Sequence, residues 1–174
     1  LHSFPTRRSS DLLHAAAAGA EVTHVDASKK AIAQAFENRD VCGFQDAPIR
    51  FITDDVSGFV AREIRRRRTY DGIIMDPPKY GRGPKGETWR IEEDLRSLLR
   101  QAINLLSGQA LFLVLTIYAI RASSLAAHYA LADLLKDRPG SIEAGELAIE
   151  ESALSGLDTR RYISQANFAR WAAY

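Results

Sequence analysis

Short apolar runs rich in β-branched residues alternate with stretches of helical spacing, and this alternation limits the possible fold more than any other feature of the sequence. The expected strands are residues 21–26, 49–53, 70–75, 110–115, 141–150 and 161–171. The expected helices are the helix tail 13–19 and residues 28–38, 57–67, 95–106 and 123–135. Such alternation predicts an α/β domain with a mostly parallel sheet and helices on both faces. The last two strands have no helix between them, so we expect them to pair antiparallel.

The segment Asp76-Pro77-Pro78-Lys79-Tyr80 follows the third expected strand directly. Each proline fixes φ at about −65° and removes a backbone N–H, so the loop is stiff and poor in donors. The Asp76 carboxylate and the Pro77 carbonyl then remain available as acceptors. The alternative is a turn that only closes a buried strand. The next segment, residues 81–87, is basic and rich in glycine, so we expect a mobile loop where a substrate would enter. This neighbour favours a functional role for the Pro-Pro loop.

Acidic residues end three successive expected strands, namely Asp26, the pair Asp54-Asp55, and Asp76. Ligands of open α/β sheets bind at the carboxyl ends of the strands. Any one of these aspartates, taken alone, is more often a helix N-cap than a ligand. The acids together with the Pro-Pro loop therefore indicate a binding site at this edge of the sheet.

Composition narrows the classes of protein that fit. The chain has 174 residues, which suits one domain, and its net charge of +1 does not by itself favour nucleic acid. The arginine run 65–68 is interpreted either as a solvated helix end or as a contact with an RNA backbone. The single cysteine, Cys42, excludes a disulfide framework and a cysteine zinc site, and fits a reducing cytoplasm. No metal site is expected, and no apolar run is long enough for a membrane span.

Residues 1–12 read as the in-frame translation of a common sequencing adapter. A signal or transit segment is the alternative, because arginines and serines occupy residues 7–10. A signal peptide would need an apolar segment and a cleavage site after the arginines, and the alanine-rich stretch that follows provides neither convincingly. The hypothesis is that residues 1–12 are an artefact of cloning or assembly and that the domain is residues 13–174.

Residues 19–28 and 76–87 carry a resemblance to the class I S-adenosylmethionine-dependent methyltransferases, which extends from about residue 13 to the end of the chain. More narrowly, the chain resembles the branch that contains large-subunit ribosomal RNA cytosine-C5 methyltransferases, whose members carry Asp-Pro-Pro-Lys-Phe-like loops. The fold implied is the Rossmann-like methyltransferase sheet. The cofactor implied is S-adenosylmethionine, with Asp26 at its ribose, Asp55 and the Val56 amide at its adenine, and Ser28 and Asp76 also beside it.

The same resemblance implies that the Pro-Pro loop faces the substrate. Asp76 would orient the acceptor, and Lys79 would contact phosphate or support the loop. Tyr80 would stack on a base, although a packing role is an equal alternative. The remaining residues assigned to substrate binding are Pro77, Pro78, Arg82 and Lys85.

Two departures from the family pattern shape the expected function. Cytosine-C5 methylation needs a thiolate, yet Thr116 and the residues after it include no cysteine, and Cys42 lies elsewhere. Transfer to a nitrogen needs mainly positioning and remains open. The glycine-rich loop and first strand of the family should precede Leu13, so an amino-truncated, inactive fragment is expected. The predicted function is methyl transfer to a base of ribosomal RNA; alternatives are a protein or small-molecule methyltransferase, or a binding module without catalysis.

Overall fold

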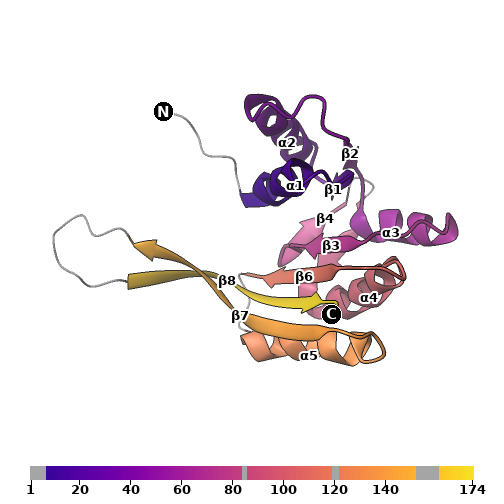
Figure 1. Ribbon diagram of the computed structural model, residues 1–174, viewed down its shortest axis with the longest axis vertical. Helices are drawn as coiled ribbons and strands as arrows, with labels where there is room; N and C mark the ends of the chain where they lie inside the picture. Colours follow the sequence, from indigo (N-terminus) through magenta and orange to yellow (C-terminus); the bar gives the residue numbers. More distant parts are fainter. Residues whose placement is uncertain (1–6, 84–85, 119–121, 152–160) are drawn as a thin grey trace. The chain divides into compact units, whose positions relative to one another are not determined.

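The computed structural model describes residues 7–83, 86–118, 122–151 and 161–174, and its helices and strands alternate along most of the chain (Figure 1). The chain divides into two compact units, which we describe separately. The first unit contains the residues up to Arg62 together with Arg82–Thr88. The second unit contains Glu63–Gly81 and Trp89–Tyr174. Helix α3 (Val56–Arg65) contributes residues to both.

The first unit is built on two parallel strands, β1 (Val22–Asp26) and β2 (Ile49–Thr53). Helix α2 (Lys29–Val41) connects them, and the Ser28 hydroxyl caps it by accepting a hydrogen bond from the Ala31 amide at 3.2 Å. The small core of this unit contains Leu12, Leu13 and Ala35, against which Val22, Phe44, Ile49 and Phe51 pack. The strand–helix–strand order predicted for this segment is confirmed.

Helix α1 (Arg7–Ala17) begins inside the segment that the sequence marks as a possible artefact. Leu12 and Leu13 are both 6% exposed, so the boundary at residue 13 cuts through a helix that contributes to the core. The helix tail expected from residue 13 is therefore the second half of α1. The origin of residues 1–12 stays a hypothesis.

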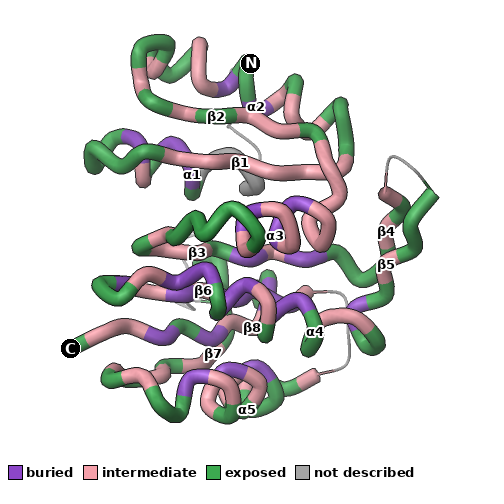
Figure 2. Tube along the Cα trace, turned by 90° about the vertical axis from the view of Figure 1, so that its right-hand side faces the viewer, coloured by how far each residue is buried: buried purple, intermediate pink, exposed green. Residues whose placement is uncertain are grey.

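The second unit is built on a four-stranded sheet in the order β3-β6-β8-β7. Strands β3 (Gly72–Met75) and β6 (Phe112–Ile117) are parallel, whereas β8 (Arg161–Ala172) runs antiparallel to both β6 and β7 (Ser141–Glu151). The antiparallel pairing of the last two strands was predicted. Figure 2 shows that β6 and the inner part of β8 are the most buried strands of this sheet.

Helix α5 (Ser124–Leu135) lies against β7 and β8 (Figure 1), and α4 (Ile91–Ile103) contacts α5 and buries its apolar face. The side chains of Leu99, Leu113, Leu115 and Leu131 are fully buried. The helical spacing of leucines in α4 and the apolar run of β6 were both readable from the sequence because each element presents a continuous apolar surface.

Two details of the fold differ from the sequence-based expectations. The segment 81–87 was expected to be a loop, but β4 (Tyr80–Arg82) and β5 (Thr88–Arg90) form a two-stranded sheet. The amide of Gly83 donates to the carbonyl of Glu87 at 2.8 Å, and Gly86 has a φ of 90°. The third strand begins at Gly72, because Tyr70 makes only an isolated bridge with Leu106.

Among the described strands, β1 and β3 each have an unpaired edge to which a further strand could hydrogen-bond. Among the described residues, β1 has only β2 as a hydrogen-bonded neighbour and β3 has only β6. Each of these strands therefore has one edge without a strand partner. No helix in the described part of the chain has the length and apolarity needed to cross a membrane.

Candidate cofactor and substrate site

In the first unit, the aspartates at the ends of β1 and β2 lie side by side. Asp26 pairs in register with Thr53, and the Asp54 amide donates to the Asp26 carbonyl at 3.1 Å. The Asp26 Oδ1 accepts from the Ser28 amide at 2.7 Å, which fixes the carboxylate at the start of α2. Within the described residues, its Oδ2 has no hydrogen-bond donor. The carboxylate is half-buried and can accept from a further ligand.

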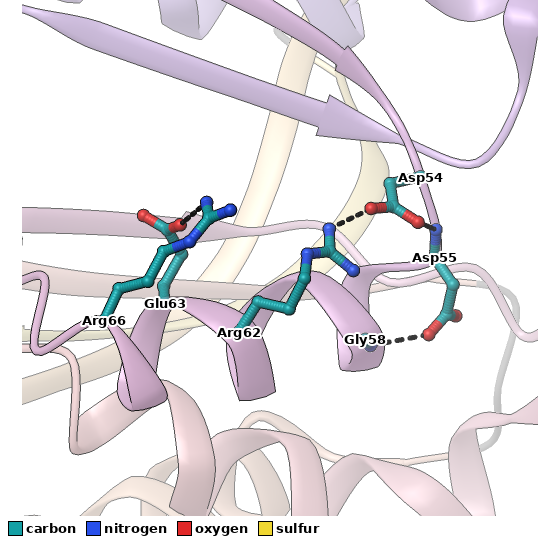
Figure 3. Close-up of polar contacts among 6 residues, drawn as sticks. All are labelled: Asp54, Asp55, Gly58, Arg62, Glu63 and Arg66. Atoms are coloured by element: carbon teal, nitrogen blue, oxygen red, sulfur yellow. Dashed lines mark hydrogen bonds and ion pairs between the residues drawn. The ribbon is translucent and has the colours of Figure 1, made fainter.

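Asp54 and Asp55 have different partners, as Figure 3 shows. Asp54 Oδ1 accepts from the Asp55 amide at 2.9 Å, and its Oδ2 forms an ion pair with Arg62. Asp55 Oδ2 accepts from the Gly58 amide at 2.7 Å and so caps helix α3, which begins at Val56. Asp55 is thus a helix N-cap, which is the alternative role that the sequence left open for each of these aspartates. Its other oxygen remains able to accept from a ligand.

In the second unit, Asp76 directly follows β3 and is held by the neighbouring strand. Met75 pairs in register with Leu115, which places Thr116 opposite Asp76. The Thr116 hydroxyl contacts Asp76 Oδ1 and also lies 3.4 Å from the Met75 carbonyl. A hydroxyl has one proton, and a carboxylate is the stronger acceptor, so the bond to Asp76 dominates. Because Thr116 is 8% exposed, Asp76 is fixed from its buried side.

The loop after Asp76 is anchored through its backbone. The indole of Trp89 donates to the Pro78 carbonyl at 2.7 Å, and the Ile91 amide donates to the Lys79 carbonyl at 3.1 Å. Pro77 is buried, whereas the side chains of Lys79 and Tyr80 are exposed, with Tyr80 at 52%. The loop is therefore held through its backbone, while the side chains of Lys79 and Tyr80 lie at the surface.

The other residues assigned to the substrate lie on the β4–β5 segment or beside it. Arg82 is exposed at the end of β4. Lys85 lies outside the described residues. Cys42 is exposed at the carboxyl end of α2 and belongs to the first unit, whereas β6 belongs to the second. In the described part of the chain, no group of three or more histidine, cysteine, aspartate or glutamate side chains could hold a metal ion.

Sequence reasoning missed Thr116 and Trp89. Thr116 was noted only because it occupies a segment without cysteine, and its link to Asp76 depends on the pairing of two strands far apart in the sequence. A polar residue at the end of an otherwise apolar buried strand was the available signal. Trp89 carried no such signal, because its partner is a backbone carbonyl.

His24 in β1 gives the first unit a pH dependence. Burial lowers the pKa of His24, and the Asp26 carboxylate opposes this in part. Since the folded state then binds fewer protons than the unfolded state, stability declines as pH falls below about 6.5, the ordinary pKa of histidine. We expect His24→Gln to reduce the loss of thermal midpoint between pH 7.5 and pH 5.5, followed by far-ultraviolet circular dichroism. An equal loss of thermal midpoint in the variant and the unmodified chain would show that protonation of His24 does not contribute to the pH dependence of stability.

No protein-family model matches the chain. Two proteins of Methanocaldococcus jannaschii, provisionally named as ribosomal RNA large subunit methyltransferases, are similar to it over part of its length. One is 32% identical over 88 residues, or 51% of this chain, and the other is 34% identical over 73 residues, or 42% of it. The aligned region is 21% and 19% of those two proteins, so the chain matches about a fifth of each relative.

Among solved structures, a SAM-dependent methyltransferase of Agrobacterium tumefaciens has a TM-score of 0.91 and 46% identity. The alignment covers 96% of this chain and 53% of that one. A methyltransferase structure complexed with SAH has a TM-score of 0.66 at 19% identity, over 95% of this chain and 43% of that one, and shows likeness of fold alone. This chain therefore has the α/β Rossmann-like fold of class I SAM-dependent methyltransferases.

Proposed function

We propose that the protein to which this chain belongs transfers a methyl group from S-adenosylmethionine to a base of ribosomal RNA. The observation that carries the proposal is the half-buried Asp76, fixed by Thr116 at the carboxyl end of β3 and followed by the anchored Pro-Pro loop. The 46% identity to a SAM-dependent methyltransferase supports the reaction type. The names of the two M. jannaschii relatives support RNA as the substrate.

The acids of the first unit fit a nucleoside cofactor. Asp26 keeps one carboxylate oxygen for a ribose diol, and Asp55 keeps one for an adenine amine while it caps α3. The Val56 amide, at the start of α3, is a donor suited to an adenine nitrogen. Ser28 uses its hydroxyl oxygen to cap α2, so its contribution to the cofactor site would be to fix Asp26 through its amide. Bound S-adenosylmethionine would supply the electrophilic methyl group.

The narrower assignments stay part of this proposal. Asp76 and Pro77 would hold the acceptor base, Lys79, Arg82 and Lys85 would meet phosphates, and Tyr80 would stack on a base. The acceptor atom is a nitrogen in this proposal, because β6 ends in Thr116-Ile117 and is followed by Tyr118, with no cysteine there that could attack C6 of cytosine. In this proposal the first strand and glycine-rich loop of the family would precede Leu13. A cytoplasmic location follows from the substrate.

Transfer of label from radioactive S-adenosylmethionine tests the proposal in the protein with its upstream segment in place. We expect label in ribosomal RNA lacking the modification, with the mark mapped to a ring or amino nitrogen of one base. Label found only in protein or small molecules would overturn the RNA assignment. Loss of RNA labelling in Cys42→Ser would instead support a thiolate mechanism. Cofactor binding without any transfer would indicate a binding module.

Cofactor affinity gives an independent test in the same protein. Asp26→Ala should weaken S-adenosylmethionine binding by about 1.5–3 kcal/mol, because a carboxylate that accepts from a diol makes charge-assisted bonds. Asp55→Ala should cost less, since a neutral amine is a weaker partner. Titration calorimetry measures both. Asp26→Asn is the control for local structure, because its amide oxygen still accepts from the Ser28 amide. If Asp26→Ala bound S-adenosylmethionine with unchanged affinity, the assignment of the ribose to the end of β1 would be wrong.

A further inference from the structure

A cluster of arginines lies at the edge of the second unit that is opposite to Asp76. Residues 65–68, which we call the arginine turn, connect the end of α3 to the residues before β3, whereas Asp76 follows β3. The arginine turn and Asp76 are therefore at the two ends of β3, Gly72–Met75. Four residues of strand separate these ends by about 13 Å. The proposed methyl-transfer site accounts for none of these arginines.

The backbone of the arginine turn does not require arginine. The Arg67 amide donates to the Ile64 carbonyl at 2.9 Å, and the Arg68 amide donates to the Glu63 carbonyl at 3.0 Å. These two bonds satisfy carbonyls at the end of α3 without any help from a side chain. Arg67 has a φ of 55°, in the left-handed region where glycine is the favoured residue. A strained arginine at this position indicates a role for its side chain.

Three of the four arginines have no carboxylate partner among the described residues. Arg66 pairs with Glu63 at 3.2 Å, and that glutamate also accepts from the Tyr70 hydroxyl at 2.8 Å (Figure 3 draws the ion pair). Arg65, Arg67 and Arg68 are exposed and form no ion pair with any described residue. The arginine turn thus presents three uncompensated charges to solvent. One or two cations would be enough to complement the dipole of the helix end.

The turns after α4 and α5 lie at the same edge of the second unit as the arginine turn and contribute further charged residues to it. The Tyr70 amide donates to the Leu105 carbonyl at 2.8 Å, so the segment after the arginine turn adjoins the turn after α4. Arg138 donates to the Leu106 and Ser107 carbonyls at 2.9 Å, which brings the turn after α5 to this edge. The other exposed cations of these helix ends are Arg100 and Lys136; the acids are Asp71, bonded to the Ser107 hydroxyl, and the exposed Asp133 and Asp137.

We propose that the arginine turn binds phosphates of an RNA backbone at the edge of the sheet remote from methyl transfer. A guanidinium offers a planar fork of donors that matches a phosphate, and phosphate contacts position an RNA without reading its sequence. The choice of RNA among polyanions rests on the proposed function, but the charged surface does not. The RNA would then span β3, with one segment at Asp76 and another on the arginine turn.

Fluorescence anisotropy with a labelled single-stranded RNA tests this surface on the 174-residue chain, without any methyl-transfer assay. The variant R65Q/R67G/R68Q should bind at least about fivefold more weakly at low salt. It should also lower the slope of log affinity against log salt concentration by about 2, since three contacts contribute about 0.7 each. The control R96Q/R161Q/R170Q removes the same formal charge from exposed positions elsewhere in the second unit, one of which, Arg170, pairs with Glu143 at 2.6 Å. Its slope should stay within about 0.5 of the unmodified chain.

A single substitution separates binding from stability. Arg67→Gly should raise the thermal midpoint by about 2–4 °C, because it relieves the left-handed backbone, and should still weaken RNA binding. Arg67→Lys should keep the salt slope. A lowered midpoint together with unchanged RNA affinity would show that Arg67 serves the fold and would overturn the proposal. Equal losses in the triple variant and its control would also overturn it, as would binding through the arginine turn to vesicles containing phosphatidylserine but not to RNA. A methyl-transfer failure alone would leave these results intact.

Discussion

Asp76→Ala should slow methyl transfer by at least about 10²-fold in the protein with its upstream segment, and should leave affinity for S-adenosylmethionine nearly intact. The reason is geometric. Asp76 is fixed by Thr116 and is followed by the anchored loop, so its role is to orient the acceptor before the methyl group moves. Single-turnover rates with saturating cofactor measure the effect. A loss confined to cofactor affinity would show that Asp76 acts on the cofactor instead.

The matched control is Asp71→Ala, which removes a carboxylate just before the same strand and should leave the transfer rate within about threefold of the unmodified protein. Thr116→Val tests the positioning of Asp76, because valine keeps the shape of threonine and removes the hydroxyl. It should slow transfer by about tenfold, and Thr116→Ser should restore the rate. In the double variant with Asp76→Ala, Thr116→Val should add little, since both changes remove one arrangement. Full additivity would show that Thr116 acts independently of Asp76.

Gly140→Ala should destabilise the second unit by about 3 kcal/mol, with a fall in thermal midpoint of about 6–12 °C. Gly140 joins α5 to β7 with a φ of 153°. A Cβ atom there would lie 2.4 Å from the Trp171 indole nitrogen and 2.5 Å from the Ala172 carbonyl oxygen. Trp171 is 3% exposed, so it has little room to move away. Thermal unfolding followed by tryptophan fluorescence reports on this unit, which contains both tryptophans.

Gly108→Ala is the control for this prediction. Gly108 lies in the exposed turn after α4, its φ is not positive, and a Cβ atom would meet nothing within 4 Å. We expect a change within about 0.5 kcal/mol. Equal effects of the two substitutions would mean that loss of glycine freedom, rather than contact with Trp171, determines the stability.

The parts of the fold that the sequence predicted are those whose signal is local and apolar. Strand β6 reads as a continuous buried run, and α4 shows leucines at helical spacing. Strands β4 and β5 have three residues each and contain glycine or charged residues, so no periodicity reveals them. Helix α1 extends into residues that were set aside for their resemblance to an adapter. A DNA-level argument does not determine whether those residues form a helix.

The candidate site was predictable where one residue type at one strand end carries the information. Asp26 ends β1 and Asp76 directly follows β3, as expected, because the ends of apolar runs are visible in the sequence. The different roles of Asp54 and Asp55 were not predictable. They depend on which carboxylate pairs with Arg62 and which accepts from the Gly58 amide. The contact between Thr116 and Asp76 joins residues forty positions apart and appears only once β3 and β6 are paired.

The position of β8 has a consequence for synthesis on the ribosome. Because β8 lies between β6 and β7, the strand that leaves the ribosome earlier, β7, has no sheet to join until β8 has followed it. At about 5–20 residues per second, the wait from Ile142 to its partner Trp171 lasts seconds. During that interval the sheet of the nascent second unit contains only β3 and β6. Its sheet can therefore close only after β8 emerges, and a pause in translation before Arg161 would prolong the exposure of an unpaired β7.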